Sequence, residues 1–332
     1  MTDLETAFAT EITTDVVVRI GTRSSELALR QARQVAAALS ARGIASELVT
    51  YTTIGDRVLD RSLSAIGEKG LFTAELEADL IAGRTDCAVH SLKDLPTADP
   101  AGLTIVALLE REDPRDALVV RPGVTAQTLE ELPLGARVGT SSLRRRAQLR
   151  LLRPDLEVCE LRGNVGTRLR KIDDGEVDAA LLAAAGLRRL GLGDRIVAFL
   201  DAPAWLAAPG QGAIAVQART ADARMTAVLA TLDHAETRTS ITAERALLGA
   251  LEGGCQVPIG AVMLRTEHGA TLHGVIVAVD GTQVVRGSIA VNLADPAAAG
   301  RALARQLHRD GGAEILALLR PREEAAPMHG AY

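Results

Sequence analysis

The sequence predicts an α/β protein of three domains. Strands rich in Val, Ile, Leu and Ala alternate with amphipathic helices from residue 16 to about 232, and polar turns with Gly, Ser or Thr stand at the strand-to-helix junctions. From about residue 235 the order changes to a helix, three alternating strands and a further helix, which predicts a small α+β domain. The length of 332 residues fits two or three domains, and the apolar content of 47% is ample for their cores.

Composition narrows the class of protein. No apolar run reaches transmembrane length, and residues 1–15 carry acids where a signal peptide carries bases, so we expect a soluble, cytoplasmic protein with a disordered leader. The net charge of −5 argues against a general nucleic-acid binder. Cys87, Cys159 and Cys255 are an odd set without CxxC spacing, so neither a disulfide framework nor a zinc site is expected, and we predict no bound metal.

The first domain is predicted over residues 16–112. Its strands are expected at Val16–Ile20, Glu47–Thr53, Asp86–His90 and Leu103–Leu109, with helices after the first two of them. Residues 55–70, GDRVLDRSLSAIGEKG, lack periodicity and are rich in charge and glycine, which predicts a mobile loop. The turn after the third strand, SLKDLP, places Lys93 and Asp94 at a strand end, where α/β sheets bind ligands.

The second domain is predicted over residues 115–208, after a hinge-like run at 110–116, EREDPRD. Its elements are expected as strands Ala117–Val120, Ala136–Gly139, Leu156–Leu161 and Asp178–Ala183, helices from Ser142 and over Asn164–Asp173, and a turn at Gly186–Gly191. Pro209–Gly212, PGQG, resembles a second hinge. The strand Ala213–Gln217 after it is expected to return to the first sheet, which adds residues 213–232 to the first domain.

The third domain is predicted over residues 235–320. Its elements are expected as a helix at Thr239–Leu251, strands at Ala261–Arg265, Thr271–Val279 and Gln283–Val291, and a helix at Pro296–Arg309. We expect residues 321–332 to form a disordered tail.

The stretch Gly139–Arg170 is the most unusual in the chain. It carries eight arginines in two groups, and each group stands where a Gly/Ser/Asn turn opens a helix. Helix starts favour anions through their free N–H groups and dipole, and guanidinium groups bind carboxylate or phosphate with two hydrogen bonds. At this point two interpretations stay open: a solvated basic face, or a site for a molecule with several negative charges.

Two further side chains invite a chemical interpretation. Asp94 is either a solvated turn acid or a carboxylate that holds N–H donors and stabilises a developing cation. Cys255 follows two glycines and precedes Gln-Val-Pro, an exposed and specially shaped turn, so a covalent role stays open for it. Cys87 and Cys159 stand inside predicted strands and are expected to be structural.

Nine motifs occur in a fixed order: GTRSSELAL, GEKGLFTAELE, AVHSLKDLPT, EREDPRDAL, VGTSSLRRRAQL, ELRGNVGTRL, AAAGLRRLGL, PGQGAIAV and AERALLGALEGGCQVPIGA. Together they closely resemble the porphobilinogen deaminase family, also called hydroxymethylbilane synthase, over roughly Val16 to Leu319. The resemblance implies two domains like type II periplasmic binding proteins with a hinged cleft, followed by the small third domain.

The resemblance also implies an activity. Family members deaminate porphobilinogen and join four units head to tail into 1-hydroxymethylbilane, in tetrapyrrole biosynthesis. Their cofactor is a dipyrromethane bound by a thioether to the cysteine of GGCQVPIG, which is Cys255 here. The aspartate of the HSLKDLP motif, Asp94, is implied to bind pyrrole N–H groups and to stabilise the azafulvene cation left when ammonia departs. Family members are usually monomers.

The resemblance implies further site residues, whose arginines bind the acetate and propionate arms of cofactor and substrate. On the cofactor side they are Lys93, Thr140, Ser141, Ser142, Arg144, Arg145, Arg162, Arg168 and Gly212. On the substrate side they are Arg23, Ser25, Lys69, Arg189 and Gln211. The chain departs from common family patterns at Glu26 and Ala65, which concerns details of loop closure.

Two rival functions follow from the residues alone. A non-catalytic, two-lobed anion-binding protein accounts for the arginines and the hinges but gives no role to Cys255 or Lys93-Asp94. A nucleic-acid binder accounts for the arginine-rich stretch but is disfavoured by the acidic net charge.

Overall fold

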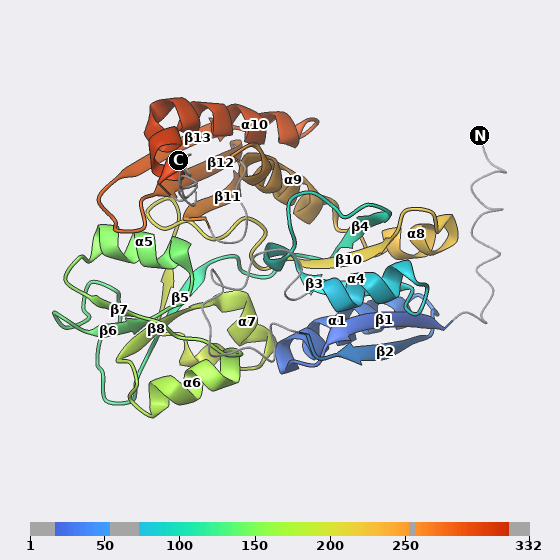
Figure 1. Ribbon diagram of the computed structural model, residues 1–332, viewed down its shortest axis with the longest axis horizontal. Coiled ribbons are helices and arrows are strands. Elements are labelled where there is room, and N and C mark those ends of the chain that lie inside the picture. Colours follow the sequence, from blue (N-terminus) through green and yellow to red (C-terminus); the bar gives the residue numbers. More distant parts are fainter. Residues whose placement is uncertain (1–16, 54–72, 252–256, 319–332) are drawn as a thin grey trace, which may run out of the picture.

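The computed structural model describes residues 17–53, 73–251 and 257–318. Its strands form two five-stranded sheets and one three-stranded sheet, each with its own helices (Figure 1). We call these three assemblies the first lobe, the second lobe and the third layer. This mixed α/β fold with a small third sheet is the one that the sequence predicts.

The first lobe has the strand order β2-β1-β3-β10-β4. Its elements are β1 (Val18–Arg23), α1 (Glu26–Ser40), β2 (Ser46–Tyr51), α4 (Ala74–Ile81), β3 (Cys87–Ser91), a 3₁₀ turn (Leu92–Asp94), β4 (Leu103–Leu108), β10 (Ile214–Arg219) and α8 (Ala223–Ala230). β1 is parallel to β2 and β3, whereas β10 is antiparallel to β3 and β4. β10 therefore brings the chain back to the sheet that it left after β4.

The alternation of side chains along the strands explains how helices cover this sheet. Ile20 and Cys87 pack with α1 and α8 on one face, whereas Ala88 and Leu103 pack with α4 on the other. Cys87 is fully buried, as expected for a structural cysteine, and burial raises the pKa of its thiol to about 12.

The second lobe has the strand order β7-β6-β8-β5-β9. Its elements are β5 (Asp116–Val120), β6 (Arg137–Gly139), α5 (Leu143–Leu152), β7 (Glu157–Cys159), α6 (Val165–Asp173), β8 (Ala179–Ala183), α7 (Ala184–Arg189) and β9 (Ala198–Leu200). The predicted turn at Gly186–Gly191 is wrong in its first part, because α7 runs through Arg189 with Leu187 buried in the core. The hinge-like run also ends earlier than predicted, since Asp116 begins β5 and is fully buried.

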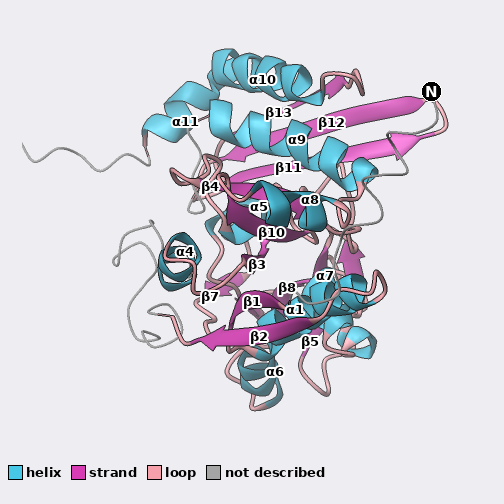
Figure 2. Ribbon diagram, turned by 90° about the vertical axis from the view of Figure 1, so that its right-hand side faces the viewer, coloured by secondary structure: helices cyan, strands magenta, loops and turns pink. Residues whose placement is uncertain are grey.

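The third layer consists of a three-stranded antiparallel sheet with helices on one side (Figure 2). Its elements are α9 (Ala235–Ala250), β11 (Ile259–Thr266), β12 (Gly269–Val277), β13 (Val284–Ala290), α10 (Pro296–Leu307), a π-helical turn (His308–Gly312) and α11 (Ala313–Ala317). α9 begins four residues before the predicted start, because the His234 side chain accepts a hydrogen bond from the Thr237 amide and caps the helix.

The third layer contacts both lobes. Val262 and Val275 of its sheet pack against Ala147 of α5 in the second lobe. Ile241 of α9 packs against Leu92 and Leu108 in the first lobe.

Two chain segments connect the first and second lobes, and they cross at Gly212. The Glu112 amide donates to the Gly212 carbonyl at 3.2 Å. Gly212 has a φ of +89°, and a Cβ atom there would lie 2.3 Å from the Glu112 carbonyl oxygen, so this crossing requires glycine. The domain limits given above stay predictions.

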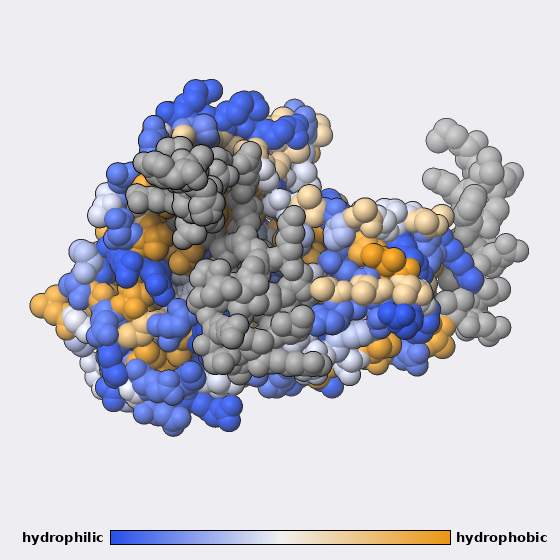
Figure 3. Space-filling model, viewed as in Figure 1, coloured by the Kyte–Doolittle hydropathy of each residue, from blue (hydrophilic) through white to orange (hydrophobic). Residues whose placement is uncertain are grey.

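The surface seen in Figure 3 is mostly polar over the outer helices. Hydrophilic side chains dominate around α10 at the top and α6 at the bottom of this view. Among the described residues, no helix combines the length and the apolar character needed to cross a bilayer.

Candidate functional site

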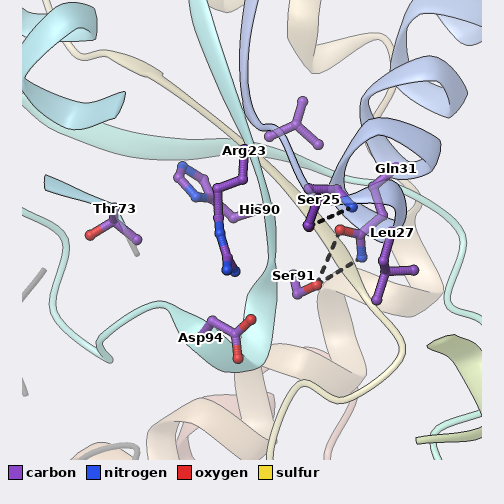
Figure 4. Close-up of a pocket in the computed structure, with 10 residues that line it drawn as sticks. Arg23, Ser25, Leu27, Gln31, Thr73, His90, Ser91 and Asp94 are labelled. Atoms are coloured by element: carbon purple, nitrogen blue, oxygen red, sulfur yellow. Dashed lines mark hydrogen bonds between the residues drawn. The ribbon is translucent and has the colours of Figure 1, made fainter. Parts of the chain in front are cut away.

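The carboxyl ends of β1 and β3 bring the first set of predicted site residues together. β1 ends at Arg23, Ser25 caps α1 by accepting a hydrogen bond from the Ala28 amide, and the 3₁₀ turn after β3 ends at Asp94. Arg23, Ser25 and Asp94 line one cavity of about 80 Å³. Figure 4 shows the Arg23 and Asp94 side chains pointing toward one another across it. Parallel pairing of β1 and β3 is the reason that these side chains meet.

Sequence reasoning missed two polar side chains of this cavity. Gln31 donates from Nε2 to the Ser91 hydroxyl at 2.8 Å, which ties α1 to the end of β3 (Figure 4). His90 lies beside them, almost fully buried, and burial lowers the pKa of its imidazole to about 4, so the ring is neutral at pH 7. His90 belongs to the motif AVHSLKDLPT, which was the available signal, whereas Gln31 lies two residues beyond the motif GTRSSELAL.

The two arginine groups of Gly139–Arg170 stand at helix starts, as predicted. Ser142 caps α5 by accepting from the Arg145 amide, and Asn164 caps α6 by accepting from the Thr167 amide. The neighbouring hydroxyls shape the first turn: Thr140 accepts from the Ser142 amide at 3.2 Å, and Ser141 donates to the Leu161 carbonyl at 2.7 Å.

Arg144 and Arg145 differ from the other arginines of this stretch because an internal carboxylate already binds them. Arg144 donates to Asp116 Oδ2 at 2.6 Å, and Arg145 donates to Asp116 Oδ1 at 2.8 Å. Both guanidinium groups are nearly inaccessible to solvent. Their predicted role with cofactor carboxylates stays a prediction, and Asp116 is a residue that sequence reasoning placed in a hinge.

Lys93 and Arg168 gather beside this pair. Burial, together with the nearby Arg145 cation, lowers the pKa of Lys93 to about 8 and that of Arg168 to about 10, while Asp94 opposes both shifts. The four groups therefore lie close enough to act on one another. The 3₁₀ turn with Lys93 and Asp94 in the first lobe and the arginines of the second lobe face the same region.

Arg162 joins Lys93, Arg168, Arg144 and Arg145 in a cluster that we call the cationic wall, and Arg189 lies in α7 beside the connecting segments. One terminal nitrogen of Arg162 and Nε of Arg189 are buried without a hydrogen-bond partner among the described residues. Arg189 also donates to the Gly212 carbonyl at 2.7 Å, and burial lowers the pKa of its guanidinium. Arg162 precedes α6, as the sequence predicts, whereas Arg189 is the last residue of α7 and not part of the predicted turn.

The arrangement fits a ligand with several carboxylates. Five cations (Lys93, Arg144, Arg145, Arg162 and Arg168) share the region with the carboxylates of Asp94, Asp116 and Glu160, so the cations outnumber the anions. Buried cations without enough internal anions are costly, so carboxylate arms of a bound group would relieve the imbalance. The residues present therefore fit a dipyrromethane, whose rings carry acetate and propionate arms.

Several predicted residues lie outside the described part of the chain. They are Cys255, Lys69, Ala65 and the whole 55–70 loop. Glu26 is described, and it is the first residue of α1, directly after the Ser25 cap. Within the described ranges, no group of three or more His, Cys, Asp or Glu side chains is arranged to hold a metal ion.

Comparisons with known proteins agree with the sequence motifs. A family model described as "Porphobilinogen deaminase, dipyromethane cofactor binding domain" matches residues 18–227, and "Porphobilinogen deaminase, C-terminal domain" matches residues 238–309. A porphobilinogen deaminase of Xanthomonas euvesicatoria is 51% identical over 304 residues, 91% of this chain and 99% of that protein. One of Roseiflexus castenholzii is 51% identical over 300 residues, 90% and 98% of the two chains.

Among solved structures, the methionine-binding protein MetQ matches with a TM-score of 0.42 at 14% identity, over 65% of this chain and 89% of that one. A nutrient-binding protein from Burkholderia cenocepacia, bound to methionine, matches with a TM-score of 0.41 at 14% identity, over 64% and 90%. The family models cover most of the chain, and the curated relatives match it over nearly their whole length. The chain therefore belongs to the porphobilinogen deaminase family.

Proposed function

We propose that this protein is a transferase that deaminates porphobilinogen, releasing ammonia, and joins four units head to tail into 1-hydroxymethylbilane for tetrapyrrole biosynthesis. The observation that carries the proposal is the excess of buried cations next to Asp94, at the carboxyl ends of β1 and β3. Family membership adds weight to this choice of substrate. We further propose that the protein works in the cytoplasm as a monomer.

A dipyrromethane bound through a thioether to Cys255 would supply the pyrrole carbon to which the first substrate unit is joined. Its carboxylate arms would contact the cationic wall described above, made of Lys93, Arg162 and Arg168 with Arg144 and Arg145 behind them. Thr140, Ser141, Ser142 and Gly212 shape the backbone of this wall. The cations hold the chain by charge-assisted hydrogen bonds and take no part in bond making.

We assign Asp94 to the deamination step. As the carbon–nitrogen bond of the substrate breaks, ammonia leaves with the electron pair and positive charge spreads onto the pyrrole N–H. The exposed Asp94 carboxylate accepts a hydrogen bond from that N–H and stabilises the charge as it develops. The bound pyrrole chain would supply the carbon that bonds to the substrate carbon, and loss of the proton from that carbon would restore the aromatic ring.

Arg23 and Ser25 are proposed to hold the incoming substrate, since they line the same cavity as Asp94. A guanidinium fork fits a carboxylate arm, and the neutral His90 beside it adds no competing charge. Arg189 and Gln211 are proposed to act where the connecting segments meet, and Lys69 is proposed as a further contact.

Intact mass spectrometry tests the proposal. Protein purified from cells that make porphobilinogen is expected to carry a covalent addition of two pyrrole units, absent from Cys255→Ala and retained in the control Cys159→Ala. Incubation with porphobilinogen is expected to consume it and to produce a ladder of heavier species. Protein at its bare sequence mass, with no consumption of porphobilinogen, would instead indicate the non-catalytic anion-binding function.

A further inference from the structure

Asp116 is the most heavily bonded carboxylate in the described part of the chain, and nothing in the mechanism above uses it. It is the first residue of β5 and is fully buried. Oδ2 accepts from Arg144 at 2.6 Å and from the indole N–H of Trp205 at 2.7 Å. Oδ1 accepts from Nε and a terminal nitrogen of Arg145 at 3.0 and 2.8 Å, and from the Gln211 amide at 2.8 Å.

These bonds hold Asp116 ionised despite its burial. Burial alone would raise the pKa of its carboxyl, but Arg144 and Arg145 hold that pKa well below the usual range. Two arginines and one aspartate leave a single positive charge, which is far cheaper to bury than two. Asp116 thus allows α5 to present two guanidinium groups at the edge of the cationic wall.

Gln211 extends the contact network from Asp116 into the first lobe. Its amide nitrogen donates to Asp116 and to the Pro114 carbonyl at 2.7 Å, which fixes the direction of the side-chain oxygen. That oxygen accepts from the Lys93 ammonium group at 3.2 Å. Lys93 precedes Asp94 in the 3₁₀ turn after β3. The 3₁₀ turn that carries Lys93 and Asp94 is therefore linked to the Asp116 carboxylate through two hydrogen bonds, both made by Gln211.

We propose that Asp116 is a positioning residue for the carboxylate-binding wall: it fixes the guanidinium groups of Arg144 and Arg145 and, through Gln211, the ammonium group of Lys93. This inference rests on the proposed function and extends it to a residue that touches neither substrate nor cofactor. Asp116 then positions both the arginines of the second lobe and the Lys93–Asp94 turn of the first lobe. The cations are held at a fixed spacing before the carboxylate arms bind, which lowers the entropic cost of binding.

A purely structural role for Asp116 makes a different prediction from this one. If Asp116 only stabilised the second lobe, its loss would lower the unfolding midpoint and leave the covalent loading rate of the folded fraction unchanged. A positioning role also changes the environment of Lys93. The charged groups that face Lys93 are Arg144, Arg145, Asp94 and Asp116, so removing the Asp116 anion leaves two arginines against one carboxylate.

The test uses the shortage of lysine in this chain. Lys69, Lys93 and Lys171 are the three lysines of the sequence, so protein labelled with ¹³C-lysine gives three side-chain signals, assigned with Lys69→Arg and Lys171→Arg. Lys93 is expected to titrate at about pH 8 in the wild-type protein. In Asp116→Asn this midpoint is expected to fall by about half a unit or more, because an anion has been removed.

Asp178→Asn is the matched control. Asp178 is also bound by two arginines, Arg121 and Arg137, but it precedes β8 at the opposite end of the β5–β8 pair from Asp116. Its removal takes the same charge from the same lobe and is expected to leave Lys93 unchanged. Covalent loading, followed by intact mass, is expected to slow about tenfold in Asp116→Asn and to stay normal in Asp178→Asn.

Identical Lys93 titration and normal loading in Asp116→Asn would overturn the proposal. If Asp116→Asn does not fold, Gln211→Met serves as the test. It removes the hydrogen bond to Lys93 and leaves both arginines bound to Asp116. A lower Lys93 midpoint with slower loading supports the proposal, and wild-type values for both overturn it. Failure of the wild-type protein to load or to consume porphobilinogen would remove the proposed function, while the Lys93 titration would still report on the contacts of Asp116.

Discussion

Arg111 and Glu244 form a two-pronged ion pair, with distances of 2.7 and 2.9 Å, that joins the segment after β4 to helix α9. The Glu244 side chain is fully buried and also accepts hydrogen bonds from the amides of Gly210 and Met263. One carboxylate thus binds both segments that connect the lobes and the first strand of the third layer. The third layer is attached at the point where the connecting segments run side by side.

Glu244→Gln is expected to destabilise the protein by about 3–5 kcal/mol, because Arg111 loses its buried partner charge. Urea unfolding measures this loss. Glu236→Gln is the control, since Glu236 is exposed and lies 3.7 Å from Arg265. Its expected effect is below about 1 kcal/mol. Equal unfolding midpoints for both variants would contradict the role assigned to Glu244.

Asp94→Asn is expected to fold with an unchanged melting temperature and to lose most of its turnover of porphobilinogen. The side chain is exposed, so the substitution removes charge without opening a core. An amide cannot balance positive charge on a pyrrole ring, and the loss is expected to reach about 100-fold or more. Asp174→Asn, at the exposed end of α6, serves as the control. Near-normal turnover in Asp94→Asn would refute the assignment.

Arg144→Leu and Arg162→Leu are expected to fail in different ways. Arg144→Leu leaves Asp116 with fewer partners in a dry site, so its melting temperature falls together with its covalent loading. One terminal nitrogen of Arg162 is buried without a hydrogen-bond partner among the described residues, so Arg162→Leu is expected to keep its stability and to load or elongate poorly. Calorimetry and intact mass on both variants separate these effects. A fully loaded, fully active Arg162→Leu would contradict the prediction.

Covalent loading is expected to weaken as the pH rises through about 8. Lys93 is protonated below its pKa of about 8 and attracts carboxylate arms, and it loses this charge above that pH. Lys93→Arg is expected to keep its charge throughout and to lose the alkaline decline. The measurement is the loading rate between pH 6.5 and 9, a window chosen around that pKa. Parallel profiles for wild type and Lys93→Arg would exclude Lys93 as the group responsible.

Local patterns explain how much of the fold the sequence predicts. Strands such as β1 and β3 are short apolar runs bounded by polar turns, and helix starts carry Ser or Asn caps, so their positions follow from neighbouring residues. α7 was missed in part because Gly186 and two arginines resemble a turn. Its helical form depends on the burial of Leu187 against the second lobe, which is a tertiary effect.

Asp116 shows the corresponding limit for the site. In the sequence it ends a run of charged residues and looks solvent-exposed. Its partners Arg144, Trp205 and Gln211 come from 28, 89 and 95 residues along the chain. The spacing of these residues in the sequence does not predict that they contact one another. Lys93 and Asp94 were predicted because they stand in a turn of unusual composition, and Arg162 and Arg168 because they stand in an arginine-rich stretch whose motifs resemble the family.

The return of the chain through β10 has a consequence for synthesis on the ribosome. β10 pairs with both β3 and β4, so the first sheet lacks the strand that joins these two until residue 219 has emerged. All strands of the second lobe lie between residues 116 and 200, and their partners are complete earlier. The internal segment of the chain can therefore finish folding before the amino-terminal one, whose β3 and β4 edges await a partner and are exposed to misassociation meanwhile.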